Sequence, residues 1–138
     1  MSIKMDDNGA FKGFMSEINE MVGIVEGEKK KIIQKGAKII KANVEKVLPK
    51  SDLDERATNY DGTPYKHMED DVKITIKDDK IGNIAAIIHG GKYTAYKWHL
   101  LDSGASDREA THFIDKALKE SDSDIGKLLD DTVRKITD

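Results

Sequence analysis

Apolar residues recur every three, four or seven positions between residues 14 and 48, which is the spacing of one face of an α-helix. This line of positions consists of Phe14, Ile18, Met21, Val25, Ile32, Gly36, Ile39, Asn43 and Val47. A second line beside it consists of Val22, Ile33, Ile40, Val44 and Leu48. The pattern stops at Pro49, because the residue before a proline avoids helical backbone angles. We therefore predict one long N-terminal helix over 14–48, with a bend near 23–27 where two glycines weaken it.

Two further apolar patterns predict a small sheet. Residues 72–77 alternate apolar and polar side chains, and residues 81–89 are almost wholly apolar, so together they predict an antiparallel hairpin. We expect Ile74 and Ile87 to face its core. Residues 93–101 are rich in aromatic side chains and suit a strand or a short helix, and we expect a third strand there.

The C-terminal third predicts two shorter helices, at 110–120 and 125–136, with a break at 121–124. The remaining segments are polar: we expect a flexible lead-in over 1–13 and a long loop over 50–71 that is functional or becomes ordered on binding. The order of the elements predicts one α+β domain over 1–138.

Composition narrows the possible functions. The absence of cysteine excludes disulfides and thiolate metal sites. No apolar run has the roughly 20 residues that a membrane span needs, and the N-terminus carries no signal-peptide pattern, so we expect an intracellular protein without membrane contact. Only 38% of residues are hydrophobic and 36% are charged. This composition favours a small hydrophobic core that contacts with neighbouring subunits complete.

Charge is distributed unevenly along the chain. Residues 28–50 hold eight lysines and two glutamates, whereas residues 51–138 hold 13 basic and 19 acidic residues. Four lysines share one face of the predicted helix at steps of four, three and three: Lys31, Lys35, Lys38 and Lys41. Such a stripe suits a polyanion, including the DNA backbone, or it keeps the helix soluble.

Candidate catalytic residues are few. His89 and His99 with Asp102 are a possible metal set across a sheet, although dispersed histidines are usually structural. No two histidines have the i, i+4 spacing of a zinc-binding helix. The sequence also lacks a nucleophile-elbow motif and a phosphate-binding-loop motif. We therefore expect no catalysis and no cofactor. The aromatic residues around Tyr96 and Trp98 fit either the core of the sheet or an interface anchor.

The order of these parts resembles the head–tail joining, or tail-completion, family of neck proteins in long-tailed phages. Chains of that family run as a long charged helix, a proline-marked loop, a β-hairpin, an aromatic stretch with an acidic residue and a glycine, and a helix carrying phenylalanine. The matching pieces here are 29–49, 72–88, 96–106 and 111–117. The family-motif region is represented by Tyr96, Trp98, Asp102, Gly104 and Phe113.

The resemblance implies a structural virion protein that forms a homo-oligomeric ring, such as a hexamer, in the phage neck. The ring joins or completes the tail at the capsid, and phage DNA passes through its lumen without sequence specificity. The implied partners are further copies of the chain and other neck proteins, of the head-completion (adaptor) and tail-terminator types. Assembly takes place in the cytoplasm of the bacterial host.

Within such a ring, we expect the lysine stripe to meet either an acidic face of the next subunit or the DNA lumen. The apolar residues expected at the subunit interface are Val22, Ile33, Ile40 and Val44. Two other functions stay open. One is a small metal-dependent hydrolase or nuclease that uses His89, His99 and Asp102, and the other is a regulatory or toxin-related module whose basic helix binds nucleic acid.

Overall fold

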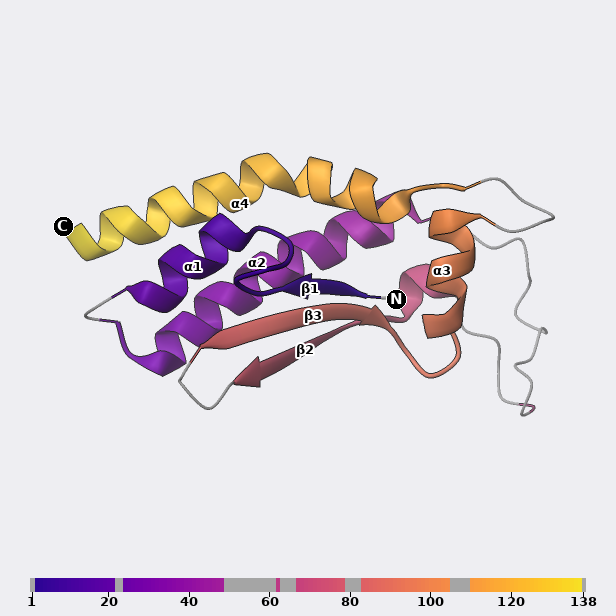
Figure 1. Ribbon diagram of the computed structural model, residues 1–138, viewed down its shortest axis with the longest axis horizontal. Coiled ribbons are helices and arrows are strands. Elements are labelled where there is room, and N and C mark those ends of the chain that lie inside the picture. The colour runs from indigo at the N-terminus through magenta and orange to yellow at the C-terminus, as the bar shows by residue number, and fades with distance from the viewer. Residues whose placement is uncertain are drawn as a thin grey trace.

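The computed structural model describes residues 2–21, 24–48, 62, 67–78, 83–104 and 110–137. Its elements are, in chain order, β1 (Ile3–Met5), α1 (Lys12–Glu20), α2 (Glu26–Val47), the short 3-10 helix η1 (Met68–Asp70), β2 (Val72–Asp78), β3 (Ile84–Gly90), α3 (Ala95–Ser103) and α4 (Phe113–Thr137) (Figure 1). Helices and one small antiparallel sheet make up the described fold, which confirms the predicted α+β class.

The sheet has the strand order β1-β3-β2, so β3 is central and the other two strands are its edges. The predicted hairpin is confirmed as β2 and β3, with Ile74 opposite Ile88; its tip, at 79–82, lies outside the described residues. Successive side chains of a strand point to opposite faces of the sheet. Of the neighbours Ile87 and Ile88, Ile88 is the fully buried one. The expectation that Ile87 faces the core is therefore wrong, because Ile87 lies half-buried on the opposite face.

The third strand is β1, and not the 93–101 stretch where we expected one. Ile3 and Met5 are buried, and Ile3 pairs with Ile88 of β3. The structure thus differs from the flexible lead-in expected over 1–13, because these apolar side chains cover one edge of the core. The strand has three residues, too few for a periodic pattern to reveal it.

The predicted N-terminal helix is divided in two. The chain leaves helical geometry after α1, is extended at Met21 and again at Val25, and re-enters a helix at Glu26. This break falls where the glycines predict a bend. Asn19, near the end of α1, then fixes α1 to the sheet: its side chain donates to the carbonyl of Ile84 (3.1 Å) and accepts from the Ile84 N–H (2.9 Å).

The C-terminal stretch is a single helix of 25 residues, so the predicted break at 121–124 is wrong. Ser121 is fully buried there. Its hydroxyl donates to the carbonyl of Ala117 (2.7 Å) and accepts from the side chain of Asn43 in α2 (2.8 Å). A serine that bonds the carbonyl four residues earlier is compatible with a continuous helix.

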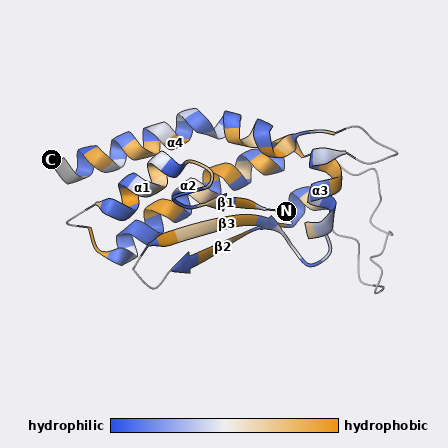
Figure 2. Ribbon diagram, viewed as in Figure 1, coloured by the Kyte–Doolittle hydropathy of each residue, from blue (hydrophilic) through white to orange (hydrophobic). Residues whose placement is uncertain are grey.

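The layers are α4, α2 and the sheet. α2 contacts both α4 and β3, and Figure 1 shows α4 running along α2 on the side away from the sheet. In Figure 2 most of β3 is coloured as hydrophobic, whereas much of α4 is hydrophilic, as an amphipathic outer helix should be. Among the described helices, none combines the length and apolar composition that a bilayer span requires.

The aromatic stretch forms α3, which packs through Trp98. The indole is fully buried and meets the ring of Phe113 edge-on, with 5.2 Å between ring centroids. Gly90 allows this approach, because a Cβ atom there would lie 2.8 Å from both the Ala95 backbone and the Trp98 indole nitrogen. Gly104 ends the helix with a positive φ of 85°, a conformation that favours glycine.

Candidate assembly surfaces

The lysine stripe lies on the outer side of α2 but divides between two depressions. Lys31 and Lys35 border a hollow of about 380 Å³, which we call the α2–α4 hollow. Its lining consists of Ile24, Glu28, Lys31, Ile32, Lys35, Leu128, Asp131, Thr132 and Lys135. Lys38 and Lys41 face the opposite side, toward β2. The stripe therefore borders two separate surfaces of the chain.

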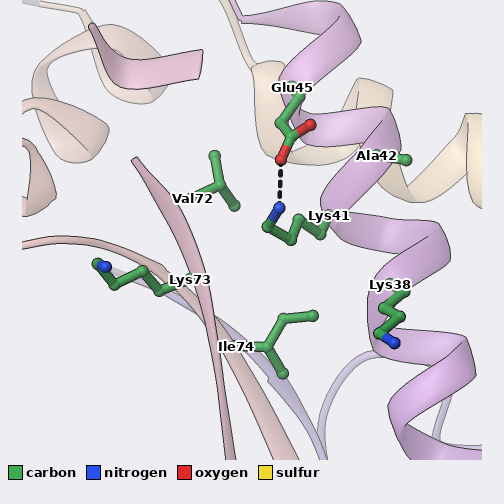
Figure 3. Close-up of a pocket in the computed structure, with 7 residues that line it drawn as sticks. All are labelled: Lys38, Lys41, Ala42, Glu45, Val72, Lys73 and Ile74. Atoms are coloured by element: carbon green, nitrogen blue, oxygen red, sulfur yellow. Dashed lines mark ion pairs between the residues drawn. The ribbon is translucent and has the colours of Figure 1, made fainter. Parts of the chain in front are cut away.

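The second depression, which we call the α2–β2 groove, has a volume of about 530 Å³. It is lined by Lys38, Lys41, Ala42, Glu45, Val72, Lys73 and Ile74 (Figure 3). Lys41 forms an ion pair with Glu45 at 2.6 Å. Val72 and Ile74 project from β2 toward α2, whereas Lys73 points to the other side of the strand. The groove thus has an apolar wall and a charged rim.

The apolar residues expected at a subunit interface are interior instead. Ile33, Ile40 and Val44 are each 0% exposed, so their assignment to an interface is wrong, and Val22 lies outside the described residues. The reason is that α2 is covered on two sides, by the sheet and by α4. Both apolar lines of the helix are therefore used within one chain.

The apolar surface that is exposed lies elsewhere. Among the described residues, the large hydrophobic side chains that are exposed are Tyr96 (63%) and Leu100 (39%), one helical turn apart on α3, and Val25 (69%) and Val133 (38%). We call the first pair the α3 patch and the second pair, whose chain neighbours Ile24 and Thr132 line the α2–α4 hollow, the valine patch. Val25 directly precedes α2, and Val133 lies near the end of α4. Figure 1 places these two helix ends at one end of the molecule and α3 at the other.

The family-motif region is a joint between α3 and α4. Asp102 accepts the Ile114 N–H through its carboxylate (3.2 Å) and the His112 N–H through its carbonyl (3.1 Å). The buried contact between Trp98 and Phe113 lies beside it, and Gly104 turns the chain away. Of the marked residues, Tyr96 alone is largely exposed, so the others hold the exposed face of α3 in position.

The histidines proposed as metal ligands are not brought together with Asp102. The two ring nitrogens of His89 are in hydrogen bonds, Nε2 with the hydroxyl of Thr75 and Nδ1 with the carbonyl oxygen of Gly90, at 2.8 Å each. His99 is exposed on α3, and the Asp102 carboxylate caps α4. The described part of the chain contains no group of three or more histidine, aspartate or glutamate side chains suited to a metal ion.

Of the four large hydrophobic residues exposed in the described chain, the sequence analysis identifies Tyr96 alone as a candidate interface anchor. It places Val25 on the apolar line of the first helix, whereas Val25 is extended and 69% exposed. Leu100 and Val133 are not singled out by it. A signal was present for α3, because a nine-residue helix with Tyr96, Trp98, Leu100 and Leu101 carries large side chains all round. Such a helix cannot bury every side chain against a single core.

In comparisons with known proteins, no protein-family model, curated protein or solved structure matches the chain.

Proposed function

We propose that this chain is a structural protein of phage assembly, one subunit of a ring in the neck that joins or completes the tail at the capsid. The observation that carries the proposal is the position of the exposed apolar residues. The α3 patch and the valine patch lie at opposite ends of the molecule.

A ring requires this kind of arrangement. In a ring of several subunits, each contact joins two different surfaces of the same chain. In a ring of six, these two surfaces lie on roughly opposite sides of the subunit. Tyrosine is enriched among residues that dominate protein interfaces. The two patches therefore supply a head and a tail for successive subunits, with the α3 patch of one copy against the valine patch of the next.

The order of the elements supports the same role. A charged helix, a hairpin, an aromatic stretch closed by Asp102 and Gly104, and a helix beginning at Phe113 follow one another, as in the tail-completion proteins that the chain resembles. The proposed role needs no catalysis and no cofactor. The proposed partners are further copies of the chain, neighbouring neck proteins and the phage DNA in the lumen, and the proposed location is the virion, assembled in the bacterial cytoplasm.

The α3 patch provides the test. Replacing Tyr96 and Leu100 together with serine should leave the fold intact, because both side chains are exposed, but it should prevent the subunit contact. Electron microscopy of phage particles produced with the variant should then show separate heads and tails. The matched control is Lys116→Ser with Lys127→Ser, two exposed positions on α4 outside both patches.

Two results would count against the proposal. Full, infectious virions from the Tyr96 and Leu100 variant would show that the α3 patch is not required for joining. Metal-dependent hydrolysis by the purified chain, lost on replacing His89 and His99 with alanine, would favour the hydrolase alternative instead.

A further inference from the structure

In the part of the chain that the structure describes, the outer edge of β2 is unpaired. β2 is seven residues long, and β3 is its one neighbour in the described sheet. Within the described residues, no backbone hydrogen bond joins β2 to any other segment. An edge strand of this length presents a row of N–H and C=O groups that can pair with an added strand.

The α2–β2 groove lies along this edge and provides space for side chains. An added strand projects every second side chain to the same face of the sheet. On the inner face, those side chains would enter the groove beside Val72, Ile74 and Ala42. This wall is apolar, so apolar side chains of modest size fit it best.

The charges around the edge select the other side chains of the added strand. Lys73 and Lys77 lie on the outer face of β2, where an added strand would place its alternate side chains directly beside them. Lys38 is exposed at the rim of the groove. The acidic residues nearby are already paired, Glu45 with Lys41, Asp78 with Lys30, and Asp71, at a longer 3.9 Å, with Lys73, whose side chain is 55% exposed. The surroundings of the edge therefore favour acidic side chains.

We propose that the free edge of β2 and the α2–β2 groove bind an extended segment of a partner protein whose side chains alternate between acidic and apolar. The segment adds a fourth strand to the sheet, with its apolar side chains in the groove and its acidic side chains beside Lys73 and Lys77. This is strand addition, in which backbone hydrogen bonds give affinity and alternate side chains give specificity. The inference does not depend on the ring, because it concerns a surface outside both apolar patches.

Two other occupants fit this surface less well. A phosphate backbone accepts hydrogen bonds but cannot donate them to the carbonyl groups of β2. Its charged oxygens would also lose hydrating water beside the apolar wall of the groove, which costs free energy. The other edge of the sheet in a second copy, β1, is three residues long and carries Lys4 at its centre. Like charges on neighbouring strands oppose pairing.

Synthetic peptides test the proposal directly. The probe is a seven-residue peptide of alternating glutamate and valine, titrated into the purified full chain and followed by the NMR amide signals of β2. We expect saturable shifts at β2 and at the α2 residues of the groove. Methylating the amide nitrogens of the peptide at one alternate set of positions should abolish binding, while methylating the other set should have little effect, because only one set faces β2.

Variants of the edge and the groove test the side-chain part of the proposal. Lys77→Glu, on the face where the acidic side chains would lie, should weaken binding by about threefold to tenfold, since reversing an exposed charge changes the free energy by around 1 kcal/mol. Lys127→Glu, an exposed position on α4, is the control. Ala42→Trp should fill the groove and block the peptide, whereas Ala42→Ser should not.

Several outcomes would overturn the proposal. These are the absence of saturable shifts at β2, equal loss of binding with both methylated peptides, and equal affinity for a lysine–valine peptide. Binding of duplex DNA at the same amides, or concentration-dependent self-association that shifts them without peptide, would assign the edge to a different occupant.

Discussion

The carboxylate of Asp71 is 3% exposed and lies at the junction between the sheet and α3. The hydroxyl of Thr94, which is fully buried, donates to it at 2.9 Å. The N–H of Gly91 in turn contacts the Thr94 hydroxyl (3.2 Å) and donates to the Asp71 carbonyl (3.0 Å). Lys73 adds a longer ionic contact of 3.9 Å. These bonds hold the turn that positions α3, and with it the α3 patch.

Replacing Thr94 with valine should therefore destabilise the fold. The change keeps the shape of the side chain but removes a donor from a buried carboxylate, so we expect the free energy of unfolding to fall by about 1–3 kcal/mol. Urea denaturation measures it. Thr132→Val is the matched control, because its hydroxyl donates to the carbonyl of Leu128 within the same helix, α4 (2.7 Å). Equal stability of the Thr94 and Thr132 variants would contradict the proposed role of this bond.

At the scale of a single strand, the two faces of β3 differ in their neighbours. Ile88 is fully buried against α2, whereas Ile87 lies half-buried on the opposite face, between Lys4 of β1 and Thr75 of β2. The apolar run itself does not distinguish them. The packing of the sheet on α2 does.

This difference predicts unequal effects of the same substitution. Ile88→Ala should lower the free energy of unfolding by about 3 kcal/mol, because it leaves a cavity in the core. Ile87→Ala should cost about 1 kcal/mol, because less apolar area is lost from contact. Chemical denaturation of both variants measures the pair. A larger loss for Ile87 than for Ile88 would show that the orientation of β3 is reversed.

At the scale of the helices, two glycines have opposite surroundings. A Cβ atom at Gly126 in α4 would meet nothing within 4 Å, whereas one at Gly36 in α2 would lie 3.2 Å from the ring of Phe14. Gly36 therefore lets α1 and α2 approach each other closely.

Alanine substitution should separate the two positions. Gly126→Ala should raise the free energy of unfolding by about 0.5–1 kcal/mol, since alanine is the better helix former. Gly36→Ala should lose this gain to crowding against Phe14. Thermal and urea unfolding compare them, and an equal gain at both positions would mean that the helix contact is loose.

At the scale of the whole molecule, charge and exposed apolar surface occur together at one end. Lys31 and Lys35 border the α2–α4 hollow, beside the start of α2 and the end of α4 where the valine patch lies. In the proposed ring this end faces the next subunit. The alternative is that the lysines face the DNA in the lumen.

Reversing both lysines distinguishes the two arrangements. Lys31→Glu with Lys35→Glu should block the joining of heads and tails if the pair contacts an acidic surface of the next subunit, because like charges then meet across the interface. If the pair faces DNA, joining should proceed while DNA retention or ejection changes. Lys116→Glu with Lys127→Glu on α4 is the control. Normal infectious particles from the first variant would leave these lysines without a role in assembly.

Local patterns along the chain were enough to predict the class of fold, the hairpin and the approximate location of the main helices. Each of these follows from a local repeat of apolar side chains, which reports the period of the element. The exposed character of Lys31, Lys35 and Lys38 could also be predicted, because charged side chains at helical spacing rarely lie inside. The absence of thiolate chemistry followed from composition alone.

Features that depend on neighbouring segments follow from long-range packing instead. The second apolar line of α2 is interior because two layers, the sheet and α4, cover that helix. The spacing of apolar residues along the chain does not show how many layers cover a helix. The strand β1 exists only through pairing with β3, and α3 is helical where aromatic residues suggested a strand, because Trp98 packs on Phe113. The exposed ends of the molecule and the free edge of β2 likewise arise from long-range packing, so the surfaces proposed for binding became visible only in three dimensions.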